Sequence, residues 1–231
     1  MGLEAGRFPR RGAWHGGIGA RAASSCGAFG LSGRDLQALG WISEQYAVRM
    51  DELAVLLGRS ERTAQRFARR CRAGGLVHAQ PVLAGEPSWL WLTSAGRRIA
   101  PTDYRGWSMR IGLLAHVSAV NRVRLYVSER SPESEWICER RLAQDLPRGR
   151  HLPDAVVQTP GGARHAIEVE LTPKSHRRLE AIIDELHDGH DAIVYFTTPV
   201  TQRQLERAGA SERWPHLALR CVPDLPATAA A

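Results

Sequence analysis

The sequence predicts an α+β protein made of two parts, a mainly helical first part and a mixed α/β second part built on a central sheet. Short amphipathic helical patterns follow one another early in the chain, and strand-like segments alternate with helical ones later. The charge is also uneven, because residues 1–110 hold 16 arginines against 8 acidic residues, whereas residues 111–231 hold 15 basic and 16 acidic residues. A basic half joined to a nearly neutral half indicates a module that binds a polyanion, attached to a second domain. A genome whose base content favours arginine codons would explain the total charge, but it would not explain the uneven distribution of charge along the chain.

The chain begins with a segment that has no hydrophobic periodicity. Residues 1–30 are rich in glycine, alanine and arginine, and we expect a disordered basic arm there. A short disordered tail is expected at residues 227–231. Ser32 is the expected N-cap of the first helix, whose apolar face is formed by Leu36, Leu39, Ile42 and Tyr46.

Two more helical patterns follow the first. The second helix is expected from Met50 to Leu57, with Gly58 as the residue that ends it. The third begins after Ser60, a good N-cap, and stops at Gly74. Its buried face follows the helical spacing i, i+3, i+4, i+7, at Ala64, Phe67, Ala68 and Cys71.

A β-hairpin and a short helix complete the first part. The strands are expected at residues 76–82 and 88–92, and the closing helix at residues 93–100. Three helices followed by a two-stranded ribbon is the element order of a winged helix-turn-helix. The sequence therefore predicts such a DNA-binding domain over residues 31–106.

The third helix carries a polar stripe on the face opposite Phe67. Arginine can pair with guanine and glutamine with adenine in the major groove of DNA, and flanking arginines contact phosphates. A solvated basic face on an ordinary core helix is the alternative interpretation. The residues expected to read bases or contact phosphates are Arg62, Gln65, Arg66, Arg69, Arg70 and Arg72.

The second part, residues 107–226, alternates between helical and strand patterns. Their mixed order predicts a central sheet flanked by helices. The expected elements are a helix at 108–128, a strand at 135–138, a hairpin at 154–171, a helix at 173–186, a strand at 192–196, a helix at 202–208 and a strand at 217–222.

Three acidic residues are expected to gather on the hairpin. If Pro160-Gly161-Gly162 forms a three-residue loop, Asp154 lies opposite Glu168, and strand alternation places Glu170 on the same face. A two-residue turn would shift the register and put Asp154 on the other face.

Crowded carboxylates repel one another unless a cation lies between them. The sequence therefore predicts Asp154, Glu168 and Glu170 as ligands of Mg²⁺ or Mn²⁺, and Lys174, the only lysine, as the group that steadies a phosphate. Together these four are the candidate catalytic residues. The alternative is that the acidic residues pair with neighbouring arginines on a solvated sheet.

These residues resemble the Pro-Asp…(Asp/Glu)-x-Lys nuclease superfamily, over residues 107–200. The resemblance implies a restriction-endonuclease-like fold for the C-terminal domain. The chain departs from the pattern at the lysine position, which is Glu170, although some restriction endonucleases of that superfamily carry Glu-x-Glu.

The whole arrangement also resembles the replication-relaxation family of actinobacterial plasmids and integrative elements, over residues 31–200. The resemblance implies roles in plasmid replication, DNA relaxation and conjugative mobilisation. The motifs that carry it, beyond the winged helix, are Leu113-Leu114-Ala115-His116, Asn121-Arg122-Val123-Arg124-Leu125, His151-Leu152-Pro153-Asp154-Ala155 and Ala166-Ile167-Glu168-Val169-Glu170-Leu171-Thr172.

Three functions are therefore considered, each with double-stranded DNA as the partner or target. The first is a site-specific DNA-binding protein that nicks DNA with a metal, and the second a DNA-binding accessory factor whose nuclease-like domain is inert. The third is a transcriptional regulator. Further partners considered are a second copy of the chain, in a homodimer, and replication or conjugation proteins. No apolar stretch approaches about 20 residues, so we expect no membrane contact and a cytoplasmic location.

Overall fold

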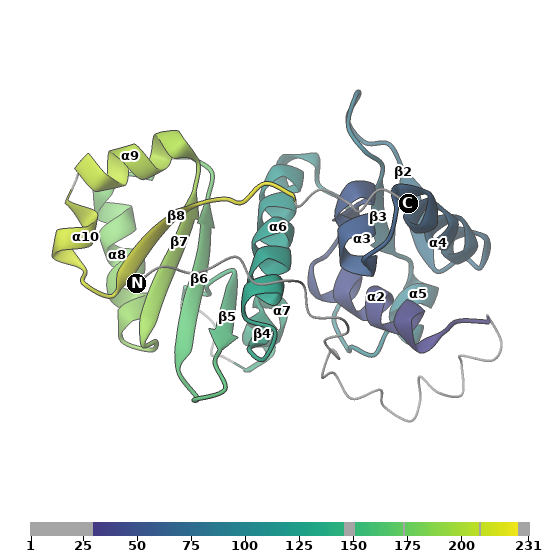
Figure 1. The fold of residues 1–231 in the computed structure, drawn as a ribbon, viewed down its shortest axis with the longest axis horizontal. Coiled ribbons are helices and arrows are strands. Elements are labelled where there is room, and N and C mark those ends of the chain that lie inside the picture. The colour runs from purple at the N-terminus through teal and green to yellow at the C-terminus, as the bar shows by residue number, and fades with distance from the viewer. Residues whose placement is uncertain (1–29, 146–150, 173, 208, 226–231) are drawn as a thin grey trace.

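The computed structural model describes residues 30–145, 151–172, 174–207 and 209–225. The expected N-terminal arm, apart from residue 30, and the expected tail lie outside the described residues. The described chain is α+β, with a three-stranded sheet in the order β1-β3-β2 and a five-stranded sheet in the order β4-β5-β6-β7-β8. Figure 1 shows the two sheets on opposite sides of the molecule.

The first helix, α2 (Gly33–Glu44), begins with a capping box between Ser32 and Asp35, in which each side chain accepts a hydrogen bond from the other's backbone N–H. The helix ends before Tyr46, which the sequence places on its apolar face. This expectation was wrong because Tyr46 takes a left-handed backbone conformation, with φ at 71°.

A helix-turn-helix follows. It consists of α3 (Met50–Leu57) and α4 (Glu61–Ala73), and α3 has the bounds that the sequence predicts. Between the two helices, Gly58 takes a left-handed conformation that side chains disfavour. The apolar faces of α2, α3 and α4 share one core with Leu76, Val77 and Leu90.

The wing pairs β2 (Val77–Gln80) with β3 (Trp89–Leu92) in antiparallel fashion. The two-residue strand β1 (Val48–Arg49) adds to the other side of β3, and the sequence does not predict it because two residues carry no periodicity. The short helix α5 (Ser94–Ile99) then closes the first part, as the sequence predicts.

A long helix connects the two sheets. The one-turn helix η1 (Ile111–Leu113) leads into α6 (Leu114–Arg130). The sequence expectation of a helix from residue 108 was wrong, because Trp107 and Met109 are held against a buried cluster that contains Trp89 and Trp91.

The second sheet consists of five strands and is flanked by helices, as the sequence predicts. Its strands β4 (Glu135–Cys138), β5 (Ala155–Gln158) and β6 (Arg164–Glu170) are antiparallel, whereas β7 (Ala192–Thr197) and β8 (Leu217–Cys221) run parallel to β6. The remaining helices are α7 (Glu139–Asp145), α8 (His176–His187), α9 (Pro199–Arg207) and α10 (Ala210–Arg213).

Two apolar layers cover the sheet. One face packs Ala155, Ile167 and Phe196 against α6. The other face packs Ala166, Tyr195 and other residues against α8 and α10. Helix α8 begins at His176 with Ser175 as its N-cap, three residues later than the sequence predicts, because the backbone of Ser175 is extended. Lys174 therefore precedes the helix and does not lie in its first turn.

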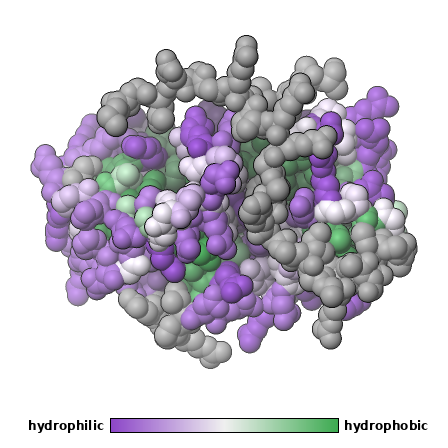
Figure 2. Space-filling model, turned by 60° about the horizontal axis from the view of Figure 1, so that its bottom comes forward, coloured by the Kyte–Doolittle hydropathy of each residue, from purple (hydrophilic) through white to green (hydrophobic). Residues whose placement is uncertain are grey.

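Helix α6 stands between the five-stranded sheet and the helix-turn-helix (Figure 1). Figure 2 shows a largely hydrophilic surface on one face of the molecule, with hydrophobic residues in separate patches. Among the described residues, no helix has the length and apolar character that a membrane crossing requires.

Candidate functional site

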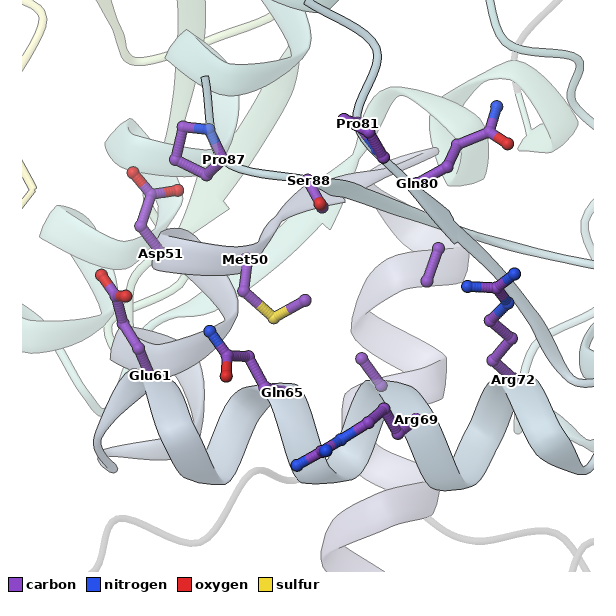
Figure 3. A pocket seen from close by; sticks show the side chains of 12 residues that line it. Met50, Asp51, Glu61, Gln65, Arg69, Arg72, Gln80, Pro81, Pro87 and Ser88 are labelled. Carbon is purple, nitrogen blue, oxygen red and sulfur yellow. The ribbon is translucent and has the colours of Figure 1, made fainter. Parts of the chain in front are cut away.

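A groove runs between helix α4 and the wing. Its volume is about 490 Å³. Figure 3 shows Gln65, Arg69 and Arg72 along α4, with Gln80 and Pro81 of the wing on the opposite wall and Asp51 and Glu61 at one end. The α4 wall is therefore mainly polar, whereas Ala79, Pro81 and Pro87 make much of the wing wall apolar.

The predicted polar stripe of α4 is exposed, while Phe67 on the opposite face is buried. Gln65, Arg69 and Arg72 line the groove, whereas Arg62 and Arg66 do not. Arg66 donates a hydrogen bond to the hydroxyl of Thr63 over 3.1 Å.

Arg70 differs from the sequence expectation that it is free to meet phosphates. Its guanidinium forms an ion pair with Asp35 over 2.5 Å, because Asp35 at the start of α2 lies beside this flank of α4. Arg70 thereby links α4 to α2.

The hairpin in the second sheet has the register that the sequence predicts with a three-residue loop. Thr159 donates its N–H to the carbonyl of Ala163, and Ala155 pairs with Ile167. Gly162 supplies the left-handed residue, with φ at 86°, that such a loop requires. Asp154 consequently lies beside Glu168.

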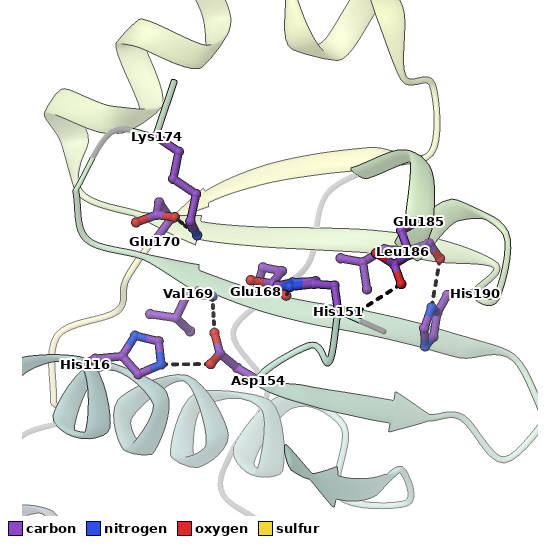
Figure 4. A network of polar contacts seen from close by, with 10 residues as sticks. All are labelled: His116, His151, Asp154, Glu168, Val169, Glu170, Lys174, Glu185, Leu186 and His190. Carbon is purple, nitrogen blue, oxygen red and sulfur yellow. Dashed lines mark hydrogen bonds and ion pairs between the residues drawn. The ribbon is translucent and has the colours of Figure 1, made fainter. Parts of the chain in front are cut away.

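Asp154 immediately precedes β5, and its carboxylate turns toward α6. Its Oδ2 accepts the N–H of Val169 over 2.7 Å, and its Oδ1 lies 2.8 Å from Nε2 of His116 on α6 (Figure 4). Burial pushes the pKa of His116 down, but the hydrogen bond and charge of Asp154 outweigh burial and raise that pKa above its ordinary value.

Glu168 has a different partner. Its Oε1 lies 2.7 Å from Nε2 of His151, and its side chain is 5% exposed. Burial raises the pKa of Glu168 to about 7, and the charge of Asp154 acts in the same direction, whereas His151 opposes the rise. In turn, the hydrogen bond that the Glu168 carboxylate accepts raises the pKa of His151.

Glu170 forms an ion pair with Lys174, and Figure 4 shows this pair apart from the other two. The lysine that the sequence assigns to a phosphate is therefore held by a carboxylate in this structure. Each of the three acidic residues has its own cationic or imidazole partner.

Tyr195 on β7 is the neighbour of Glu168 in the sheet register. Its side chain is fully buried, and among the described residues its hydroxyl has no hydrogen-bond partner. Burial raises its pKa, as do the charges of Glu168, Glu170 and Asp154. The phenol therefore lies near the acidic residues.

The predicted ligand set fits a divalent cation poorly in this arrangement. The oxygens of Asp154 are occupied by His116 and a backbone N–H, and Glu168 and Glu170 have partners of their own. Within the described ranges, no three His, Cys, Asp or Glu side chains converge to hold a metal ion. The sequence prediction of Mg²⁺ or Mn²⁺ stays a prediction.

Sequence reasoning missed the pairing of His116 with Asp154 and of His151 with Glu168. His151 lies three residues before Asp154, so the sequence alone indicates that His151 is near the hairpin. His116 lies 38 residues away on α6, and its side chain is 40% exposed. Its position on the helix allows either an approach to the acidic residues or a buried histidine, so the sequence does not decide the pairing.

No family model matches this chain, and no curated protein sequence matches it. Among solved structures, the chain is similar to a MarR-family transcriptional regulator from Silicibacter pomeroyi, with 23% identity, coverage of 46% of this chain and 65% of the regulator, and a TM-score of 0.30. It is also similar to a repair endonuclease from Pyrococcus abyssi, with 15% identity, coverage of 60% of this chain and 54% of the endonuclease, and a TM-score of 0.27. The match thus spans less than two thirds of either chain. With TM-scores this low, neither likeness carries a conclusion about this protein.

Proposed function

We propose that this chain binds double-stranded DNA through helix α4 and the wing. The observation that carries the proposal is the groove between them, along which Gln65, Arg69 and Arg72 are exposed. In the described part of the chain, none of these three side chains is held by a hydrogen bond or an ion pair. They are available to a ligand that offers phosphates and base edges.

The chemistry of these side chains matches that ligand. Glutamine and arginine have the donor and acceptor geometry that discriminates base edges in the major groove, and arginines release counterions when they neutralise phosphates. Arg62 and Arg66, exposed on the same helix beside the groove, add positive charge for backbone contacts.

Binding to duplex DNA, measured by fluorescence anisotropy over a range of salt concentrations, tests this proposal. The affinity should fall as salt rises. Arg69→Ala should weaken specific binding about five- to hundred-fold, the effect of losing one good base contact. Arg203→Ala, which removes an exposed arginine on α9, is the matched control. Equal losses in the two variants would contradict the assignment of α4.

A second candidate function is metal-dependent nicking of DNA by the five-stranded sheet. The observation that favours it is the closeness of Asp154 and Glu168, two carboxylates whose mutual repulsion contributes to the raised pKa of Glu168. Glu170 and Lys174 complete the set of candidate catalytic residues. A cation could occupy this site only if the histidine partners moved away.

Supercoiled plasmid incubated with Mg²⁺ or Mn²⁺ tests the second candidate. Wild-type protein should convert it to the open circle, and Asp154→Ala and Glu168→Ala should lose the conversion. Equal conversion by all three proteins would exclude this site, and no conversion by any would leave a DNA-binding accessory factor or a transcriptional regulator.

A role in replication, DNA relaxation or mobilisation of a plasmid or integrative element is part of the same proposal. It is supported only by the resemblance of the motifs quoted above. Enrichment of sequences bound from a library of plasmid fragments would test it, because a replication or transfer factor should select fragments that contain an origin.

A further inference from the structure

The groove that we assign to DNA contains an exposed carboxylate. Glu61 is the first residue of α4 and lines the groove together with Gln65 and Arg69. Figure 3 shows Glu61 and Gln65 on the same side of the helix, both directed toward the residues of α3. A carboxylate on the side of a helix that faces DNA opposes the attraction of the phosphates.

The second carboxylate at this end of the groove is neutralised, whereas Glu61 is not. Asp51 forms an ion pair and two hydrogen bonds with Arg49. Glu61 is exposed, and the described residues supply no hydrogen bond or ion pair to its side chain. An acidic residue also stabilises the first turn of a helix by interacting with the helix dipole, and this is the competing explanation for Glu61.

We propose that Glu61 determines sequence specificity by accepting a hydrogen bond from the exocyclic amino group of cytosine in the major groove. This inference rests on the proposed binding of DNA by α4. A carboxylate accepts only, so it suits the N4 amino donor of cytosine and is repelled by the acceptors N7 and O6 of guanine.

The position of Glu61 suits this role. Glu61 and Gln65 are four residues apart on one helix face, which separates their Cβ atoms by about 5–6 Å. Successive bases on one strand are about 3.4 Å apart along the axis, so the two side chains address bases one or two steps apart. Arg69, the base contact assigned above, and Arg72 lie further along α4 in the same groove.

Glu61 also selects against wrong sites, since its charge repels a duplex that offers no amino group to compensate. Loss of the charge should therefore strengthen binding to random DNA while it weakens discrimination. The helix-dipole explanation predicts only a small loss of thermal stability with unchanged base preference.

The test is selection from a random duplex library, followed by measurement of affinity for the selected site and for single-base variants of it. Wild type should prefer cytosine at one position by about five- to hundred-fold. Glu61→Gln should lose most of this preference and bind random duplex more tightly. Glu133→Gln, which removes an exposed carboxylate outside the groove, should keep the preference.

The outcomes separate this inference from the function on which it rests. Failure of wild type to bind duplex DNA would overturn the proposed function and the inference together. If wild type binds and Glu61→Gln keeps the same base preferences, DNA binding stands and the role of Glu61 is overturned. Thermal denaturation of each variant shows whether a change in binding comes from unfolding.

Discussion

At the scale of single residues, the most consequential side chain outside the two candidate sites is Glu52. It is fully buried on α3, and Oε1 accepts a hydrogen bond from the hydroxyl of Ser118 over 2.5 Å. Oε2 accepts from the amide of Asn121 over 2.7 Å and from the N–H of Arg49 over 2.9 Å. These bonds lower the cost of burying a charge, but burial still raises the pKa of Glu52 to about 7.

The raised pKa makes a signed prediction about stability. The folded protein binds the proton of the Glu52 carboxyl more tightly than the unfolded chain does. The stabilisation that this proton gives is therefore fully present below the ordinary pKa of 4.5, and it is lost as the pH rises through about 7. The loss amounts to about 3 kcal/mol. Urea unfolding at several pH values should show that the stability difference between wild type and Glu52→Gln changes over this window. A stability difference that stays constant with pH would contradict the raised pKa of Glu52. Glu168 is present in both proteins, so its own titration cancels in the comparison.

At the scale of elements, the position of the short helix α5 depends on one close contact with the start of the wing. Thr93 caps the helix, and its hydroxyl also donates to the carbonyl of Gly75 over 2.6 Å. The helix passes so near the start of the wing that a Cβ on Gly96 would lie 2.0 Å from the carbonyl oxygen of Leu76. Only glycine permits this approach.

Gly96→Ala should therefore destabilise the protein by about 3 kcal/mol, at the upper end of the usual cost of overpacking. The measurement is the free energy of unfolding in urea. Gly112→Ala is the matched control, because a Cβ there meets nothing within 4 Å. Similar stabilities for the two variants would show that the wing can move away from α5.

At the scale of the whole molecule, α6 joins the two sheets into one structure. Arg124 is buried on this helix, where its guanidinium pairs with Glu44 of α2 over 2.5 Å. The same guanidinium lies over the rings of Trp41 and Trp136, at 5.2 and 5.9 Å from their centroids. Trp41 belongs to the first part and Trp136 to the second, so one side chain contacts both.

The whole molecule should accordingly unfold in one cooperative transition. Tryptophan fluorescence and far-UV circular dichroism should give coincident urea curves for wild type. Arg124→Ala should shift both curves together, by about 3 kcal/mol, because it leaves Glu44 unpaired beside a buried interface. Two separate transitions in wild type would show that the halves fold independently.

The sequence by itself determined the elements whose information is local. Periodicity placed α3 and its neighbours, since a helix face repeats within a few residues. The glycine turn left two hairpin registers open, and the structure has the one that brings Asp154 beside Glu168. It did not place the end of α2, where Tyr46 turns left-handed, or the start of α6, where distant tryptophans hold the preceding chain.

Only the tertiary structure decided what the acidic residues do. A register says which backbone positions are opposite one another, but it does not say which side chains arrive from other elements. His116, which contacts Asp154, lies on α6, 38 residues earlier in the chain. Lys174 can pair with Glu170 because α8 begins after this lysine. Which cation or imidazole neutralises a carboxylate depends on which side chains lie near it in space. The spacing of the carboxylates along the chain does not say which side chains those are.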